Sequence, residues 1–239
     1  IGIDEAEGQY LANQLSANLA DDRVIRVSSG QKLDHAGWNV FARKGFLSEY
    51  RKTRQVASID LRDIKGLPGA HNHQNACAAY AACRTIGLGP KGIEAAMRSY
   101  PGLPHRSQVV AEHNGVTYVN DSKATNVNAV WFALDSFNVP LTLILGGRDK
   151  GNDYSELKEQ IKEKVHTIIA IGESRDRVKA QLEKEAPHFE SAESMREAVR
   201  IARKGAKRGE VVLLSPACSS FDMFDDYEHR GKVFKEEVN

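Results

Sequence analysis

The residues best suited to chemistry lie in one short segment, residues 120–126, which reads Asn-Asp-Ser-Lys-Ala-Thr-Asn. The segment joins a strand-like pattern to a helical one, so Asp121, Lys123 and Thr125 would stand beside the free amides of a helix N-terminus. Such amides attract anions, and a cation next to a carboxylate can divide the binding of phosphate and hydroxyl groups. The alternative interpretation is a helix cap alone, formed by the hydroxyl or amide side chains of the same segment.

Two other polar segments follow strand-like patterns. Residues 146–151 (Gly-Gly-Arg-Asp-Lys-Gly) contain glycines that let backbone approach a ligand, and Lys150 adds a positive charge, although a lysine in such a turn is often only solvated. Residues 215–220 (Ser-Pro-Ala-Cys-Ser-Ser) offer hydroxyl groups that suit a carboxylate ligand. A capping turn for a helix that starts near Asp222 explains the same residues without any ligand.

The remaining candidates are scattered. His71 and His73 lie two positions apart at the start of an expected helix, so they do not share a face and do not suit a metal pair. Asn75, in the same turn, either caps the helix or contacts a ligand. Arg106 follows a Gly-Leu-Pro linker, where a guanidinium could clamp a phosphate. Cys218 has no histidine near it in the sequence, which argues against a catalytic thiol. We therefore expect no metal site.

The elements that must position these residues differ between the two parts of the chain. From residue 109 onward, strand and helix patterns alternate, which predicts a mostly parallel sheet with crossover helices. Strands are expected at residues 109–110, 116–119, 141–145, 167–171 and 211–214, and helices at 126–137, 154–164, 175–185 and 194–204. In such sheets ligands bind beyond the carboxyl ends of the strands, so the three polar segments should line one edge.

The first part of the chain has shorter apolar groups bounded by turn residues. Strands are expected at residues 23–27, 38–42 and 55–61, and helices at 71–86 and 90–100. Gly102 and Pro104 then mark a linker. We therefore expect two domains, residues 1–102 and 103–239, in an α/β protein.

Composition narrows the class of protein. The 239 residues are 41% hydrophobic, which is typical of a globular protein, and 33 basic against 32 acidic residues leave no excess positive charge for nucleic acid. No stretch approaches the roughly 20 apolar residues of a membrane helix. Three cysteines, an odd number without metal-ligand spacing, indicate reduced thiols and a cytoplasmic location. The chain opens Ile-Gly-Ile-Asp-Glu without methionine, so we expect a piece of a longer protein.

Five motifs together resemble the ADP-forming Mur ligases of bacterial cell-wall synthesis, and they occur in the family's order. They are residues 69–75 (Gly-Ala-His-Asn-His-Gln-Asn), 102–106 (Gly-Leu-Pro-His-Arg), 120–126, 146–150 and 214–220. Residues 120–126 are the most specific, because they resemble the branch of the family that adds D-glutamate. The Asp-Asn-Pro-Arg motif of the branches that add diaminopimelate or lysine is absent.

The resemblance implies a domain assignment. Residues 103–239 are similar to the Rossmann-like C-terminal domain that binds the incoming amino acid, and residues 1–102 to the latter half of the central ATPase domain. The family's P-loop, carbamylated lysine and magnesium ligands have no matching positions. We therefore expect this stretch to be inactive by itself.

The resemblance also implies substrates and roles. ATP, with Mg²⁺, phosphorylates the carboxylate of UDP-N-acetylmuramoyl-L-alanine, and the amine of D-glutamate attacks the acyl phosphate; a monomer is expected, with no nucleic-acid or membrane partner. The nucleotide residues are Asn75 at adenine, Arg106 at the phosphates, Asp121 at the ribose and Lys123 beside the nucleotide, with Arg106 and Lys123 as the catalytic pair. The residues implied to hold D-glutamate are Thr125, Lys150, Ser220, Phe221 and Tyr227.

Two alternatives stay open. The first is another ligase of the Mur or folylpolyglutamate type, which the segments around Lys150 and Ser220 would distinguish because they contact the incoming side chain. The second is a nucleotide-binding module without catalysis, which would bind nucleotide but have no amino-acid pocket.

Overall fold

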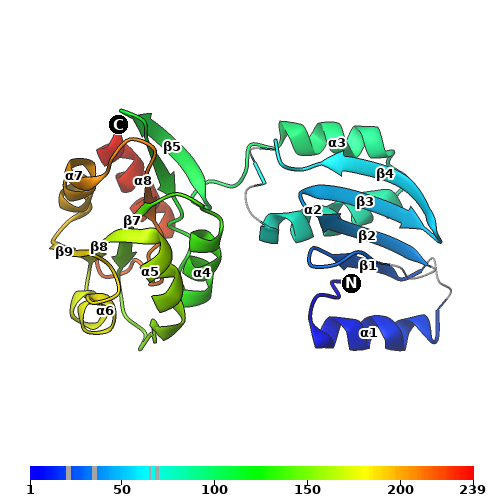
Figure 1. Cartoon of the computed structure of the whole chain (residues 1–239), viewed down its shortest axis with the longest axis horizontal. Coiled ribbons are helices and arrows are strands. Elements are labelled where there is room, and N and C mark those ends of the chain that lie inside the picture. Colours follow the sequence, from blue (N-terminus) through cyan, green and yellow to red (C-terminus); the bar gives the residue numbers. More distant parts are fainter. Residues whose placement is uncertain (20–22, 34–36, 65, 68–69) are drawn as a thin grey trace. The chain divides into compact units, whose positions relative to one another are not determined.

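The computed structural model describes residues 1–19, 23–33, 37–64, 66–67 and 70–239. The chain divides into two compact units, Ile1–Gly102 and Leu103–Asn239, each of which is described by itself (Figure 1). Gly69, the first residue of one motif, lies outside the described residues. Within the described part of the chain, no helix is long and apolar enough to cross a membrane.

The first unit is built on a four-stranded sheet in the order β1-β2-β3-β4. Strand β1 pairs with β2 in parallel, and β2, β3 and β4 form two antiparallel hairpins. The strands are β1 (Ile25–Ser28), β2 (Trp38–Arg43), β3 (Phe46–Arg51) and β4 (Arg54–Asp60). The helices among the described residues of this unit are α1 (Ala6–Ser16), α2 (Ala70–Thr85) and α3 (Pro90–Ser99).

The alternation of side chains along β2 divides the core of this unit between the two faces of the sheet. Val40 and Ala42 point to one face, where they join the buried Tyr80 of α2 in the larger apolar cluster. Phe41 points to the other face and packs with Ala12 of α1. Helices α1 and α2 therefore serve opposite faces of one sheet.

The sequence predicted β1, β2, β4, α2 and α3 to within a few residues, but not α1 or β3. Helix α1 exposes its large apolar side chains, with Tyr10 at 68% and Leu11 at 49%, so it has no clear buried stripe to recognise. Strand β3 carries a buried carboxylate, Glu49, which accepts hydrogen bonds from the Tyr80 hydroxyl (2.6 Å) and Arg84 Nε (2.9 Å). An acidic residue at a core position hides the strand pattern.

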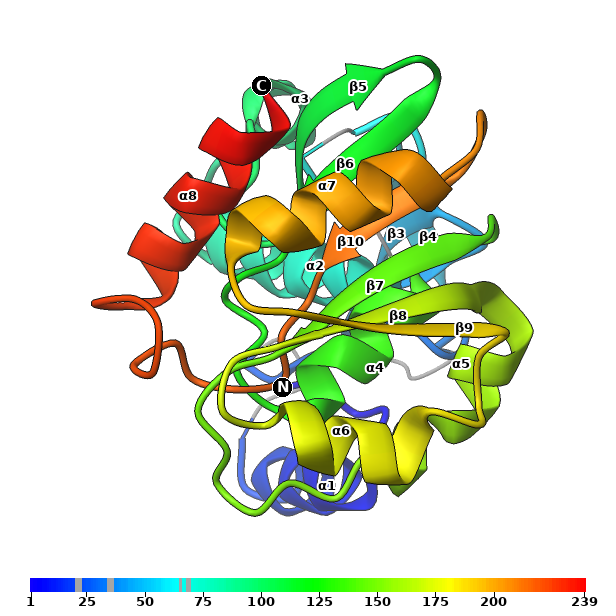
Figure 2. The ribbon, with the colours of Figure 1, turned by 90° about the vertical axis from the view of Figure 1, so that its left-hand side faces the viewer.

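The second unit contains a six-stranded sheet in the order β5-β6-β10-β7-β8-β9 (Figure 2). All neighbours pair in parallel except β5, which forms an antiparallel hairpin with β6. The strands are β5 (Gln108–His113), β6 (Val116–Asn120), β7 (Leu141–Gly146), β8 (Val165–Ile171), β9 (His188–Ala192) and β10 (Val211–Leu214). The expected α/β class with a mostly parallel sheet is confirmed.

Helices cover both faces of this sheet. The first face packs against α4 (Val127–Asp135), α5 (Lys158–Lys164) and α6 (Arg175–Leu182), whose apolar side chains meet Leu143 and Leu213 of the central strands. The opposite face packs against α7 (Met195–Gly205) and α8 (Tyr227–Val238), which meet Ile144 and Val212. Strands β7 and β10 are buried along their whole length, as expected for parallel strands covered on both sides.

Two features of this unit differ from expectation. Strand β9 was not predicted, because four of its five residues are polar or small and most of them are exposed at the sheet edge. The helix expected near Asp222 begins only at Tyr227, where the Asp226 carboxylate accepts a hydrogen bond from the His229 amide (2.7 Å). An aspartate in that position is a favourable N-cap, and it sets the start of α8.

Candidate functional site

Three loops meet at the carboxyl edge of the second sheet. The first loop (residues 120–126) follows β6, the second loop (residues 146–152) follows β7, and the third loop (residues 215–221) follows β10, which lies between β6 and β7. The Asp121 amide donates to the Leu214 carbonyl (2.8 Å), and the Arg148 amide donates to the Ser219 carbonyl (2.9 Å). Backbone hydrogen bonds therefore join the first loop to the end of β10, just before the third loop, and the second loop to the third.

Asp121 is the buried carboxylate of this edge, with 5% of its surface exposed. It accepts hydrogen bonds from the Ser107 amide (2.9 Å) and the Ser215 hydroxyl (2.9 Å). Burial raises the pKa of Asp121 to about 6, although these hydrogen bonds and the charge of Arg106 act in the opposite direction. Near neutral pH it is an anion held by neutral donors, which can also accept from a ligand hydroxyl.

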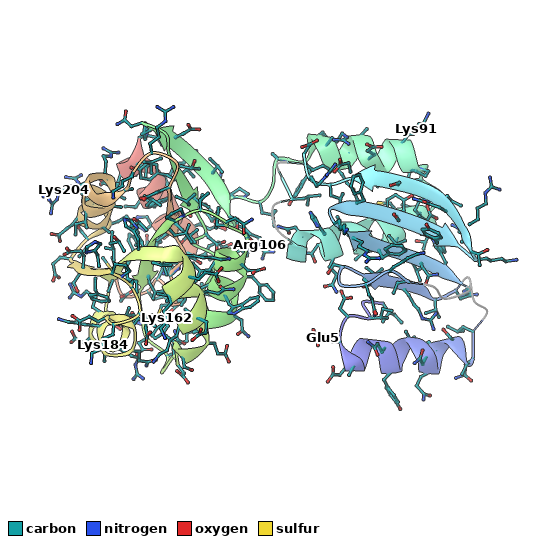
Figure 3. The ribbon with its side chains drawn as sticks, viewed as in Figure 1. Glu5, Lys91, Arg106, Lys162, Lys184 and Lys204 are labelled. Carbon is teal, nitrogen blue, oxygen red and sulfur yellow. The ribbon has the colours of Figure 1, made fainter. Side chains whose placement is uncertain are left out.

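Arg106 occupies an unusual turn beside Asp121. The residues on either side, His105 and Ser107, have positive φ angles of 60° and 44°, a conformation that non-glycine residues rarely adopt. The turn is held because the His105 amide donates to Gln108 Oε1 (3.1 Å) and the Ser107 amide to Asp121. Throughout the part of the chain that the structure describes, the exposed Arg106 guanidinium has no ion-pair or hydrogen-bond partner. The guanidinium can therefore bind an anion. The Arg106 side chain is labelled in Figure 3.

Lys123 and Tyr227 touch each other. Lys123 Nζ lies 3.2 Å from the Tyr227 hydroxyl and 4.8 Å from the centroid of its ring, a cation–π distance. The same hydroxyl donates to Glu228 Oε1 (3.0 Å). Tyr227 therefore connects the first loop to α8, and its hydroxyl already has two partners.

The capping interpretation of the first loop accounts for Asn126 alone. The Asn126 side chain accepts from the Ala129 amide (2.9 Å) and caps α4. The Ser122 hydroxyl instead donates to the Tyr227 carbonyl (2.8 Å). Thr125 is half-buried and Lys123 is exposed, and neither supplies the cap.

The second and third loops hold the other expected amino-acid ligands. Lys150 is exposed, and among the described residues its ammonium group has no partner. Ser220 is only 2% exposed, whereas the next residue, Phe221, is 59% exposed. The hydroxyl of the preceding residue, Ser219, is buried, and no partner for it lies in the described part of the chain.

Arg230 of α8 is the residue that sequence reasoning missed. It is fully buried, and its guanidinium donates to the Ser122 hydroxyl (2.9 Å), the Ser122 carbonyl (2.8 Å) and the Cys218 carbonyl (3.0 Å). Burial lowers the pKa of Arg230 to about 10, so it remains a cation at neutral pH. One side chain thus joins the first loop, the third loop and α8.

Gly231 lets α8 approach this close. A Cβ atom there would lie 2.2 Å from His105 Nδ1 and 2.9 Å from Asn120 Nδ2, too near for any side chain. The side-chain amide of Asn120 donates to the Gly231 carbonyl (2.9 Å). One face of α8 carries Tyr227, Arg230 and Gly231, because their spacing is i, i+3 and i+4. This spacing is the signal in the sequence that could have shown that the face packs on the loops.

Asn75 belongs to the first unit, on the exposed side of α2. It borders a groove of about 550 Å³ that Gly2, Val27 and Gln74 also line. The side-chain amide of Gln74, the residue before Asn75, donates to Asp4 Oδ2 (2.7 Å), which fixes the Gln74 side chain. Asn75 is therefore presented to solvent from a well-held turn.

The buried carboxyl of Asp121 predicts a pH effect on stability. Because its folded pKa lies near 6, above the ordinary value of 3.8, the folded protein keeps a proton that the unfolded chain releases. This contribution to the free energy of unfolding is fully present below about pH 4 and is lost as the pH rises through 6. The loss amounts to roughly 3 kcal/mol at most. Chemical denaturation of the wild type and Asp121→Asn, at about pH 4 and pH 7, checks this. Equal pH dependence in the two proteins would contradict it.

The chain is similar in sequence to known proteins. A family model, the Mur ligase glutamate ligase domain, matches residues 105–218. UDP-N-acetylmuramoylalanine–D-glutamate ligase of Ruegeria pomeroyi is 58% identical over 238 residues, which is all of this chain and 50% of the relative. Residues 105–218 therefore match a Mur ligase glutamate ligase domain. The enzyme of the same name from Jannaschia sp. is 51% identical over 238 residues. The chain spans about half the length of the curated relatives it matches.

Solved structures share the fold of the chain. UDP-N-acetylmuramate-alanine ligase of Thermotoga maritima has a TM-score of 0.62 at 13% identity. The match covers 88% of this chain and 47% of the Thermotoga maritima chain. MurF of Acinetobacter baumannii has a TM-score of 0.61 at 13% identity, and the match covers 97% of this chain and 55% of the MurF chain. FolC of E. coli in complex with ADP has a TM-score of 0.58 at 18% identity, covering 88% and 47%.

Proposed function

We propose that residues 1–239 are part of an ADP-forming ligase that adds D-glutamate to UDP-N-acetylmuramoyl-L-alanine during peptidoglycan synthesis, as a monomer in the cytoplasm. The observation that carries this proposal is the meeting of three loops at one sheet edge, with Arg106 and Lys150 as exposed cations and Asp121 as a buried carboxylate. The names of relatives 51% to 58% identical support the choice of amino acid.

We assign the nucleotide to Asn75, Arg106, Asp121 and Lys123. An exposed amide suits the adenine edge, a free guanidinium suits phosphate oxygens, and a carboxylate accepts from ribose hydroxyls. The proposed domain roles follow, with residues 1–102 as part of the ATP-binding domain and 103–239 as the amino-acid-binding domain. ADP and AMPPNP complexes of FolC-type structures with this fold support ATP as the nucleotide.

ATP requires a divalent metal, for which we propose Mg²⁺. One related fold was solved with AMPPNP and a manganese ion. In the described residues of this chain, no group of three or more His, Cys, Asp or Glu side chains could hold a metal. We propose that the metal ligands lie in the part of the ligase that residues 1–239 do not include, and we assign no metal-binding role to a side chain of this chain.

We assign D-glutamate to Thr125, Lys150, Ser220, Phe221 and Tyr227. A dicarboxylate needs a cation and several neutral donors. The second loop exposes two cations, of which Arg148 pairs with Glu173, whereas Lys150 has no partner among the described residues. The Tyr227 hydroxyl is shared with Lys123, so the two proposed ligand sites are in contact. These groups would bind and orient the amine, while Arg106 and Lys123 would stabilise the negative charge that develops at the acyl phosphate.

Replacing Lys150 by alanine tests the proposed amino-acid site. In the full-length ligase, we expect Lys150→Ala to raise the KM for D-glutamate by roughly tenfold to a hundredfold, because a charge-assisted hydrogen bond contributes about 1.5–3 kcal/mol. The KM for ATP should change little. Lys162→Ala, which removes a surface lysine paired with Glu185, is the matched control. An unchanged KM for D-glutamate would remove Lys150 from the site.

A further inference from the structure

The second loop is held on its inner side by the third loop. The Gly146 amide donates to the Pro216 carbonyl (2.9 Å) and the Arg148 amide to the Ser219 carbonyl (2.9 Å). Gly147 lies so close that a Cβ atom there would be 2.4 Å from the Ser219 carbonyl oxygen. The first half of the second loop is thus held by backbone contacts, and the Arg148 side chain adds an ion pair with Glu173.

The second half of the loop, which carries Lys150, is organised by Asp149. Oδ1 of Asp149 accepts hydrogen bonds from the amides of Gly151 (2.8 Å) and Asn152 (3.1 Å), so the carboxylate closes a turn around Lys150. Its other oxygen, Oδ2, forms an ion pair with Nε of Arg177. Burial alone would raise the pKa of Asp149, but the amides and Arg177 hold it below its ordinary value. The turn is therefore built on an ionised carboxylate.

Arg177 reaches this turn from a well-anchored helix. Its neighbour Val178 and the last residue of α6, Leu182, are fully buried in the core of the second unit. Gln181 of the same helix accepts from the Tyr154 amide (2.9 Å). Helix α6 is thus tied to the core and to the chain after the loop, so it can support Asp149 from a fixed position.

We propose that Arg177 is a positioning residue for the D-glutamate site, because through Asp149 it holds the second loop in the conformation that presents Lys150. The proposal rests on the proposed function, in which Lys150 binds a carboxylate of D-glutamate. Arg177 itself does not contact the ligand. It limits the motion of the turn, so that less ordering of the loop is needed when the ligand binds.

The ion pair acts on the loop more than on the fold. The Arg177 side chain is 47% exposed and that of Asp149 is 19% exposed. Exposed pairs of this kind contribute little to global stability. We therefore expect Arg177→Ala to leave the melting temperature nearly unchanged while it loosens the turn, which separates positioning from folding.

The test measures the loop and the ligand in the same protein. Amide hydrogen exchange at Gly151 and Asn152, followed by NMR, reports whether the turn is closed, and titrations with D-glutamate and with ADP report binding. We expect Arg177→Ala to accelerate exchange at both amides and to weaken D-glutamate binding by about twofold to fivefold, the range that an exposed ion pair allows. ADP binding should stay unchanged, and Arg177→Lys should restore part of the loss.

Lys179→Ala is the control, because it removes a half-exposed ion pair with Glu183 from the same helix. It should behave as the wild type. Suppose that the wild-type protein binds D-glutamate and that Arg177→Ala matches it both in amide exchange and in affinity for D-glutamate. That result would overturn the positioning role of Arg177 and leave the proposed function standing. If the wild-type protein does not bind D-glutamate, the proposed function fails, and the proposal fails with it.

Discussion

Replacing Arg230 by methionine is expected to lower the free energy of unfolding of the second unit by roughly 2–4 kcal/mol and to weaken the binding of both proposed ligands. Methionine relieves the desolvation of a buried cation, which by itself is favourable. It also leaves the carbonyls of Ser122 and Cys218 buried without the donor that each has now. We expect the second effect to prevail because three acceptors, these two carbonyls and the Ser122 hydroxyl, lose a donor while only one charge is removed.

Urea denaturation of the second unit and titration with ADP and D-glutamate measure this outcome. Arg196→Met is the matched control, because the Arg196 side chain is 81% exposed and pairs with Glu237 at the surface. The control should retain stability and both affinities. A variant of Arg230 as stable as the wild type would show that the first loop, the third loop and α8 hold together without the guanidinium.

A polypeptide limited to residues 1–239 is expected to release no phosphate from ATP in response to D-glutamate and UDP-N-acetylmuramoyl-L-alanine. Phosphoryl transfer depends on backbone amides and a lysine that cradle the phosphates. The sequence contains no Gly-x-x-x-x-Gly-Lys-Ser/Thr segment that could form this cradle. The residues proposed here to bind and orient substrates cannot replace it.

A phosphate-release assay with and without each substrate measures this result. The polypeptide should still bind D-glutamate, which serves as the control for a correctly folded second unit. Adding the half of the Ruegeria pomeroyi relative that lies outside the aligned region is a stronger test, because restored turnover would show that the missing groups reside there. Turnover by residues 1–239 alone would refute the prediction.

The sequence was most informative where local pattern and tertiary structure agree. The alternation of strands and helices after residue 108 predicted the parallel sheet, and the rule that ligands bind at carboxyl ends placed three loops at one edge. The structure brings these loops together through contacts such as that between Arg148 and Ser219. Elements that break the local rules, such as β3 with the buried Glu49, were missed.

The contacts that organise the site were not predictable in the same way. Arg230 reaches Ser122, 108 positions earlier in the chain, and only the packing of α8 on the sheet brings them together. Arg177 meets Asp149 because α6 and the second loop both adjoin the end of β7, which no periodic pattern reveals. The sequence indicated which residue types could act, while the partners of each depended on tertiary structure.

The two supports of the site differ in their response to ionic strength. The Arg177–Asp149 pair lies partly in solvent, where added salt screens the attraction between opposite charges. The buried Arg230 guanidinium instead donates to neutral oxygens, and these bonds are sheltered from dissolved ions. Concentrated salt should therefore loosen the turn around Lys150 while the junction of the first and third loops stays intact. The ionic composition of the medium would then set how well ordered the amino-acid end of the site is.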